Sequence, residues 1–192
     1  MSTFTKPRLI GISGSLRQNS FNTAILASVA ADIADRAVLE IVPLNDIPLY
    51  SEDIDTATPP HAVVRLRAAI ANADGVVIAS PEYNYGISGV LKNALDWASR
   101  PYGKSAFNGK PVLTATSSVA FTGGVRAQAQ LTETLGAIGA HVLIRPQIVV
   151  PAVHEKLKDG KLDHATLGFV RAGIDDLLKA VQANRAVLKA AA

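Results

Sequence analysis

The sequence contains no cysteine and a single tryptophan, and aromatic residues make up 5% of its 192 positions. Without cysteine the chain can form no disulfide, no thiolate nucleophile and no cysteine-based metal or iron–sulfur site. We therefore expect a cytoplasmic location. Charged residues make up 18% of the chain and hydrophobic residues 48%, which is the composition of an ordinary folded domain.

Long apolar runs and blocks of one charge are also missing. No run approaches the roughly 20 residues that a membrane-spanning helix needs. The N-terminal stretch leads directly into a short strand pattern, so no signal peptide is expected. The net charge is only +3, and the basic residues are scattered. Because nucleic acids require a concentrated basic face, we expect neither nucleic-acid nor membrane partners, whereas a small anionic ligand is compatible with the charge.

Apolar segments typical of buried strands alternate with segments of helical periodicity along the whole chain. The predicted strands are residues 8–13, 38–42, 75–79, 110–116 and 141–144, the last followed by extended chain to about 150. One predicted helix begins near Phe21, and the other predicted helices cover residues 61–73, 88–99, 124–139 and 164–189. Residues 155–161 are predicted to form a polar turn. There is no internal repeat and no linker, so residues 1–192 are predicted to form one domain.

Strands that alternate with helices predict a parallel sheet with helices on both faces. Five strands favour the flavodoxin-like order 2-1-3-4-5, a three-layer α/β sandwich. In such a sheet, ligands bind beyond the carboxyl ends of the strands, at the switch point beside strand 1. The loops after strands 1, 3 and 4, at residues 14–20, 81–86 and 117–124, are therefore the candidate binding loops.

The loop after strand 1 has the residues of a phosphate site. The start of the next helix offers free backbone N–H groups and a partial positive charge. Ser15, Ser20 and Asn22 add side-chain donors, and Arg17 adds a full charge. The loop matches neither the P-loop nor the G-x-G-x-x-G pattern, which disfavours ATP and dinucleotide binding there. An equally open alternative is that Ser20 only caps the helix and Arg17 is solvated.

The other two loops favour a flat ligand. Tyr83 and Tyr85 offer aromatic faces, and Asn84 offers polar groups for the edge of a ring. The alternative is that the tyrosines pack under a neighbouring loop and Glu82 is solvated. Residues 117–124 are small and glycine-rich, which suits either close approach to a ligand or a merely flexible loop. Together the three loops favour a phosphorylated flat heterocycle.

The same loops carry a resemblance to a known family. Gly-Ser-Leu-Arg at 14–17, Ser-Phe-Asn at 20–22, Ser-Pro-Glu-Tyr-Asn-Tyr at 80–85 and Leu-Lys-Asn-Ala-Leu-Asp-Trp at 91–97 resemble the NADPH-dependent FMN reductase family. Gly-Lys-Pro-Val at 109–112 and Gly-Gly-Val-Arg at 123–126 continue the match, which extends over about residues 8–180. Within the family, the chain is most similar to bacterial NAD(P)H:quinone reductases that are also described as chromate reductases. Ser88 departs from the pattern, because many relatives have proline there.

The resemblance implies a tightly bound FMN whose own chemistry carries the hydride, so no catalytic side chain and no metal is expected. It places the FMN phosphate at Ser15, Leu16, Arg17, Ser20, Phe21 and Asn22. It places the flavin ring at Pro81, Glu82, Tyr83, Asn84 and Tyr85, with Ser117 and Ser118 from the next loop. The substitution at Ser88 is expected to loosen the loop without removing a donor.

The implied activity is hydride transfer from NADPH or NADH to FMN and then to an acceptor that takes the place of the nucleotide, a ping-pong scheme. The implied acceptors are quinones, azo compounds, free flavins and metal oxyanions such as chromate. The resemblance also implies a homodimer that pairs into a dimer of dimers. The predicted helix at 88–99 supports such assembly, because with Trp97 it is apolar on more than one face.

Two other functions are compatible with an FMN site. A flavodoxin-type electron carrier would bind FMN and exchange single electrons with protein partners, but such carriers are usually acidic, and this chain is basic. A second alternative is an FMN-binding sensor without turnover. The four histidines are dispersed along the sequence and are interpreted as structural or surface residues.

Overall fold

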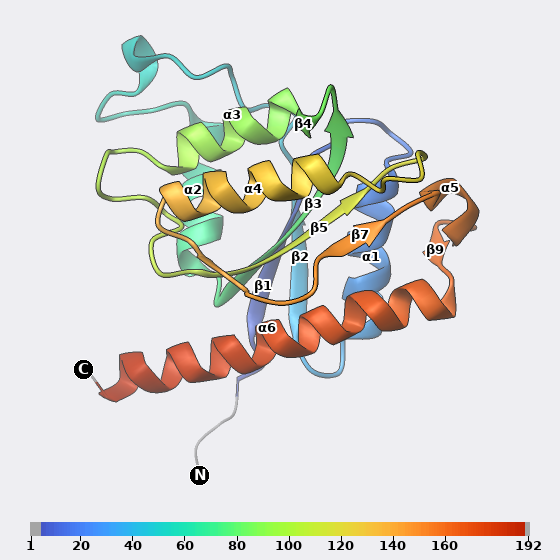
Figure 1. The fold of residues 1–192 in the computed structure, drawn as a ribbon. Coiled ribbons are helices and arrows are strands. Elements are labelled where there is room, and N and C mark those ends of the chain that lie inside the picture. Colours follow the sequence, from blue (N-terminus) through green and yellow to red (C-terminus); the bar gives the residue numbers. More distant parts are fainter. Residues whose placement is uncertain (1–4, 191–192) are drawn as a thin grey trace.

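The computed structural model describes residues 5–190 (Figure 1). Residues 1–4 and 191–192, the two ends of the predicted domain, lie outside the described residues. Residues 1–4 also belong to the N-terminal stretch from which no signal peptide is expected. None of the helices in the described part of the chain is both long enough and apolar enough to cross a membrane.

Strands and helices alternate as the sequence predicts. The strands are β1 (Arg8–Ser13), β2 (Val38–Val42), β3 (Gly75–Tyr83), β4 (Gly86–Ile87), β5 (Pro111–Ser117), β6 (His141–Val142), β7 (Ile148–Val150), β8 (Leu157–Lys158) and β9 (Lys161–Leu162). The helices are α1 (Phe21–Asp32), α2 (His61–Asn72), α3 (Gly89–Ala98), α4 (Val125–Ala137), α5 (Val153–Lys156) and α6 (His164–Ala190), with a short 3₁₀ helix, η1 (Glu52–Ile54).

The main sheet has the predicted order but more strands than predicted. Its order is β2-β1-β3-β5-β6, which is the flavodoxin-like order 2-1-3-4-5. The prediction of five strands is wrong, because the sheet has seven: β4 pairs with β3, and β7 pairs with β5. β6 and β7 share one edge and are separated by a bend at Arg145 and Pro146. A proline has no N–H to donate, which accounts for the break in this edge strand.

The predicted loop after strand 3 is largely a β-hairpin. β3 continues past Ala79 to Tyr83, and the chain returns antiparallel as β4. The turn between them consists of Asn84 and Tyr85, both with positive φ, 50° and 67°. Positive φ at both central residues is the geometry that two-residue hairpin turns require. The hairpin therefore extends β3 beyond the edge of the sheet.

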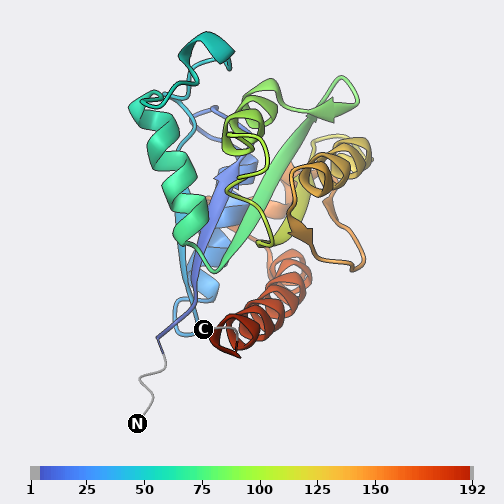
Figure 2. The same ribbon diagram turned by 90° about the vertical axis from the view of Figure 1, so that its left-hand side faces the viewer.

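Helices cover both faces of the sheet, as predicted. α1 and α6 pack on one face, and α2, α3 and α4 on the other (Figures 1 and 2). β3 illustrates the arrangement, because Val77 and Ala79 belong to the first core cluster and Val76 and Ile78 to the second. A strand that is buried on both faces has no reason to alternate with polar residues, so its sequence is a continuous apolar run.

The outer side of α3 is covered by the chain itself. Trp97 is fully buried, and its Nε1 donates to the carbonyl oxygen of Pro48 at 2.7 Å. The side chain of Asn93 accepts from the backbone N–H of Tyr50 and donates to the same Pro48 oxygen, at 2.8 Å each. The argument that this helix needs a second subunit to cover Trp97 is therefore wrong, because the segment between β2 and α2 covers it.

Candidate functional site

A cleft lies at the carboxyl ends of β1, β3 and β5, where the fold brings the three predicted loops together. Its lining residues come from all three loops: Ser15, Arg17, Ser20, Phe21, Asn22, Pro81, Glu82, Tyr83, Ser117, Ser118 and Val119. All the predicted site residues except Leu16, Asn84 and Tyr85 are in this set. The pairing of β1 with β3 and of β3 with β5 is what places residues so distant in sequence side by side.

One end of the cleft is formed by the start of α1. Ser20 is the N-cap, and its hydroxyl accepts from the backbone N–H of Thr23 at 3.3 Å. Ser20 therefore both caps the helix and lines the cleft. Asn22 is buried, and its Oδ1 accepts from the hydroxyl of Ser117 at 3.0 Å. This bond orients the amide so that its Nδ2 can donate to a ligand oxygen.

Arg17 is held at the mouth of this end. Its guanidinium donates to the carbonyl oxygen of Asn19 at 2.7 Å and lies 4.7 Å from the centre of the Phe21 ring. The side chain is exposed, but these contacts limit where it can point. A constrained guanidinium beside a helix N-terminus is suited to bind a phosphate dianion.

Ser88 connects two walls of the site. It is buried, it caps α3 by accepting from the N–H of Leu91 at 3.3 Å, and it donates to the carbonyl oxygen of Gly14 at 2.5 Å. The close approach depends on Gly14, because a Cβ at that position would lie 3.2 Å from the Ser88 hydroxyl and 3.0 Å from that of Ser80. The expectation that Ser88 loosens this region is therefore wrong.

The hairpin forms the second wall, and its side chains contradict the alternative in which the tyrosines are packed under a loop and Glu82 is solvated. Pro81 is buried, and its backbone is paired with Ser117. Tyr83 and Tyr85 are 56% and 70% exposed, which excludes their packing under a neighbouring loop. Glu82 is not solvated, because its side chain is only 11% exposed. Its carboxylate instead accepts from the backbone N–H groups of Arg126 and Ala127, at 2.9 and 3.0 Å.

The third wall, residues 117–124, is fixed by its backbone rather than flexible. The N–H of Ser118 donates to the carbonyl oxygen of Val150 at 3.1 Å, and its hydroxyl accepts from the N–H of Ala120 at 3.1 Å. Gly123 has a φ of 61°, and a Cβ there would lie 2.5 Å from Val149. Only glycine fits such a position, so the glycine-rich sequence reflects close packing.

Three predicted residues lie outside the cleft, and one lining residue was not predicted. Leu16 is about half exposed beside the mouth, and Asn84 and Tyr85 form the hairpin turn. Val119 lines the cleft and is 59% exposed. Its sequence position, two residues beyond β5, was the only available signal, because valine carries no chemistry that marks a ligand.

The carboxyl groups with lowered pKa values lie outside the cleft. In the described part of the chain these are Asp32, Asp74, Asp163 and Asp176. A hydrogen bond from Arg171 lowers the pKa of Asp32. Bonds from the backbone and the hydroxyl of Thr166 lower that of Asp163. These groups are therefore interpreted as structural.

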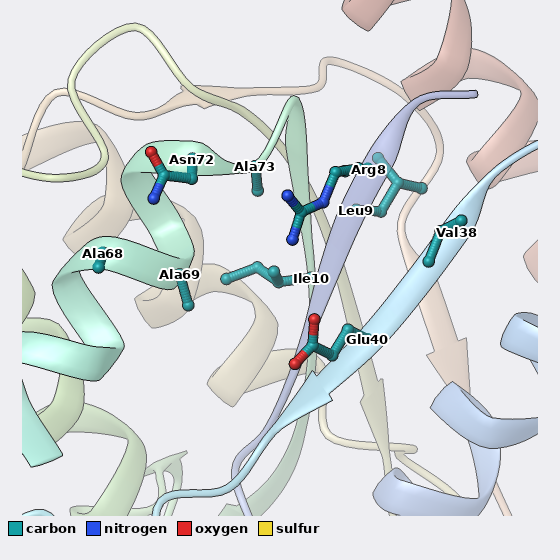
Figure 3. Close-up of a pocket in the computed structure, with 9 residues that line it drawn as sticks. All are labelled: Arg8, Leu9, Ile10, Val38, Glu40, Ala68, Ala69, Asn72 and Ala73. Atoms are coloured by element: carbon teal, nitrogen blue, oxygen red, sulfur yellow. The ribbon is translucent and has the colours of Figure 1, made fainter. Parts of the chain in front are cut away.

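A second pocket, at the end of the sheet where the parallel strands begin, has the wrong electrostatic polarity for a phosphate. It lies where β1 and β2 begin, and α2 supplies its other wall (Figure 3). Arg8 and Glu40 place opposite charges beside it, over a floor of alanines and Ile10. Ala68, Ala69 and Asn72 come from the last turns of α2, where the partial charge of a helix is negative. The cleft at the carboxyl ends of the strands is therefore the better candidate site.

The fold is flavodoxin-like, and its cleft has the start of α1 at one end and a hairpin with two exposed tyrosines at the other. The model of the NADPH-dependent FMN reductase family matches residues 7–155. The chain therefore belongs to the NADPH-dependent FMN reductase family.

Relatives with known names agree with this assignment. An NAD(P)H-dependent FMN reductase of Pseudomonas aeruginosa is 41% identical over 143 residues, which cover 74% of this chain and 77% of the relative. A quinone reductase of Escherichia coli K12 is 37% identical over 171 residues, 84% and 90% of the two chains. The structure of the flavoenzyme FerB, an NAD(P)H:(acceptor) oxidoreductase of Paracoccus denitrificans, superposes with a TM-score of 0.84 at 29% identity, covering 92% of this chain and 97% of FerB.

These findings confirm the predicted fold, enzyme class and cofactor. The protein is an oxidoreductase that uses FMN as its cofactor and NAD(P)H as its co-substrate, and it acts on small-molecule acceptors. The cleft fits this cofactor, because it joins a helix N-terminus, which is suited to bind an anion, to a wall that contains Tyr83.

Proposed function

We propose that the protein reduces quinones, azo compounds, free flavins and metal oxyanions such as chromate with NADH or NADPH. The observation that carries the proposal is the meeting, in one cleft, of the α1 N-terminus with the exposed edge of the hairpin. Bound FMN supplies the hydride and electron-transfer chemistry. A site open at its edge sets few demands on acceptor shape, which supports a broad acceptor range.

The residues of this chain bind and orient the cofactor in the proposal. The α1 N-terminus, with Ser15, Arg17 and Asn22, holds the phosphate. The strand Pro81–Glu82–Tyr83 and the backbone of Ser117 and Ser118 hold the ring. We further propose that Asn84, which has a positive φ and lies outside the cleft lining, acts through the conformation of the hairpin turn rather than through contact with the ring.

The proposed order of events is ping-pong: NAD(P)H binds, leaves as NAD(P)⁺, and the acceptor then binds at the same opening. The test is the visible spectrum of the purified protein, followed by anaerobic addition of NADH or NADPH and then of benzoquinone. The nucleotide alone should bleach the flavin absorbance, and benzoquinone should restore it. Parallel double-reciprocal plots are expected in the steady state. Intersecting plots would contradict the ping-pong order, and a flavin that no nucleotide bleaches would contradict the enzymatic proposal.

An electron carrier is the second candidate, but the charge disfavours it. Carriers of this fold are usually acidic, whereas this chain has a net charge of +3. A redox titration separates the two functions. A carrier accumulates a stable one-electron state, whereas a reductase that accepts hydride passes almost directly to the two-electron state.

We also propose a homodimer that pairs into a tetramer, in the cytoplasm, where NAD(P)H is available. The support is an apolar rim around the cleft, made by Leu16, Tyr83, Tyr85, Val119 and Phe121, of which Phe121 is 89% exposed. Such a rim is typical of an interface. Sedimentation at micromolar concentration should show a multiple of 20.1 kDa. Phe121→Ser should shift it toward the monomer, whereas Ile144→Ser, exposed at the far edge beside β6, should not; a monomeric wild type would contradict the proposal.

A further inference from the structure

The start of α4 lacks a cap of its own. Its N-cap residue is Gly124, which has no side chain to accept from the first amides of the helix. A local Ser or Asp cap cannot replace it, because Gly124 has a φ of 95° and a Cβ there would lie 3.0 Å from the Cβ of Thr116. Uncapped N–H groups in a partly buried first turn are costly, so α4 requires an acceptor from elsewhere.

Glu82 is that acceptor. Its Oε2 receives the N–H of Arg126 and of Ala127, the second and third residues of α4, from 44 and 45 positions away. A carboxylate at this place is also stabilised by the partial positive charge of the helix start. The Arg126 guanidinium adds a weaker contact, 3.7 Å from Oε1, with its own side chain half exposed.

The same helix holds the hairpin at two further points. The guanidinium of Arg126 lies 4.2 Å from the centre of the Tyr85 ring. The side-chain oxygen of Gln130 accepts from the backbone N–H of Ile87 at 2.7 Å, on β4. A two-stranded hairpin that projects from a sheet is marginally stable alone. These contacts with α4 therefore add to the stability of the hairpin, which the pairing of β3 with the short β4 alone would leave low.

We propose that Glu82 is a positioning residue for FMN, one that acts by fastening the hairpin wall of the cleft to the 117–124 wall. The inference rests on the proposed placement of the flavin ring between these walls. Pro81 and Tyr83 flank Glu82 on β3 and line the cleft, whereas Gly124 ends the facing loop. Loss of the carboxylate frees both walls at once, while the phosphate end at α1 is untouched.

The experiment compares three variants, each titrated with FMN as the FMN-free protein and then examined in its FMN-loaded form. Glu82→Ala removes the acceptor, Glu82→Gln keeps a side-chain oxygen of the same reach, and Glu133→Ala removes an exposed carboxylate farther along α4. Fluorescence titration gives the FMN dissociation constant, and the visible band of bound flavin reports on ring placement. Glu82→Ala should raise the constant at least 10-fold and shift the band. Glu82→Gln should stay within threefold of wild type, and Glu133→Ala should match wild type.

Wild-type affinity and spectrum in Glu82→Ala would overturn the inference, as would a Glu82→Gln protein as weak as Glu82→Ala. If Glu82→Ala does not fold, Gln130→Ala decides, because it loosens the same hairpin from the same helix. That variant should weaken FMN binding severalfold, and wild-type binding would overturn the inference. A wild-type protein that binds no FMN would instead contradict the proposed function, so the two failures are distinguishable.

Discussion

Arg17 supplies a full positive charge at the end of the cleft formed by the start of α1, where the phosphate is proposed to bind. Its contacts with Asn19 and Phe21 hold it there without neutralising it. A charge-assisted hydrogen bond contributes about 1.5–3 kcal/mol, which corresponds to about 10- to 150-fold in affinity. Arg17→Ala should therefore weaken FMN binding by that factor in a fluorescence titration. Arg65→Ala, which removes an exposed arginine of α2, is the control, and equal effects of the two would remove Arg17 from the site.

Substitutions of Asn84 can separate the effect of its backbone conformation from that of its side-chain amide. Its φ of 50° is a left-handed conformation that asparagine tolerates and alanine does not. Asn84→Ala should displace the neighbouring strand and slow anaerobic flavin reduction by about 10-fold, or about 1.4 kcal/mol of barrier. Asn84→Gly lacks the amide but fits the turn, so it should stay within about threefold of wild type. Stopped-flow absorbance on fully loaded protein measures both; an equally slow Asn84→Gly would show that the amide itself matters.

At the level of single residues, the sequence indicates which loops meet but not what each side chain does there. Ser15, Arg17 and Asn22 follow from the general chemistry of a strand–loop–helix anion site. Glu82 could not be predicted as a helix cap, because its partners are more than 40 positions away and the need for it arises from the left-handed Gly124. Topology predicts proximity, whereas side-chain roles depend on backbone conformations that the sequence does not reveal.

The contact between α3 and the phosphate loop gives a prediction at the scale of elements. Ser88→Ala removes the α3 cap and the bond to Gly14, and should lower the free energy of unfolding by about 1–3 kcal/mol. It should also weaken FMN binding, because Gly14 begins the loop that is proposed to hold the phosphate. Ser88→Pro suits the local φ of −62° but makes neither bond, so its FMN affinity should match that of Ser88→Ala.

The control for this contact is Ser99→Ala, at the other end of α3. The Ser99 hydroxyl donates to the carbonyl oxygen of Asp96 at 2.8 Å, so its loss affects the same helix without touching Gly14. FMN affinity should be unchanged in this variant. If Ser88→Ala and Ser99→Ala weaken FMN binding equally, the bond to Gly14 has no role in the site.

Among the elements, the strands were predictable and the hairpin was not. Strands buried on both faces are continuous apolar runs, and such runs have few alternative interpretations. The extension of β3 contains Pro81 and polar residues, which resemble a loop, and its turn lacks the Asn-Gly or Asp-Gly pair that marks a hairpin. The predicted sheet therefore had the right order and too few strands.

Acid should destabilise the molecule through carboxyl groups whose pKa values are lowered in the folded state. Asp32 on α1 pairs with Arg171 on α6, Nε to Oδ2 at 2.7 Å, and this hydrogen bond lowers the pKa of Asp32 below its ordinary value of 3.8. The pKa of Asp163, just before α6, is also lowered, by bonds from Thr166. A group with a lowered folded-state pKa contributes its full stability at pH values above its unfolded pKa. This contribution is lost as the pH falls from there through the folded-state pKa.

The free energy of unfolding should therefore fall between about pH 5 and pH 3. Asp32→Asn should be less stable than wild type near neutral pH, and the difference should shrink as the pH approaches 3. Urea unfolding of the FMN-free protein is the measurement, because the FMN phosphate would otherwise titrate as well. A constant difference across the range would mean that the charge of Asp32 contributes nothing.

The burial of Trp97 gives the molecule an internal optical reporter. The sequence has one tryptophan, so indole emission comes from a single place, where α3 meets Pro48 and Tyr50. The guanidinium of Arg67 lies 5.6 Å from the same ring and pairs with Asp55 at 2.9 Å, so the emission reports on the docking of the whole segment between β2 and α2. In the FMN-free protein, a change confined to the cleft should leave the emission maximum in place, and detachment of this segment should shift it to longer wavelength.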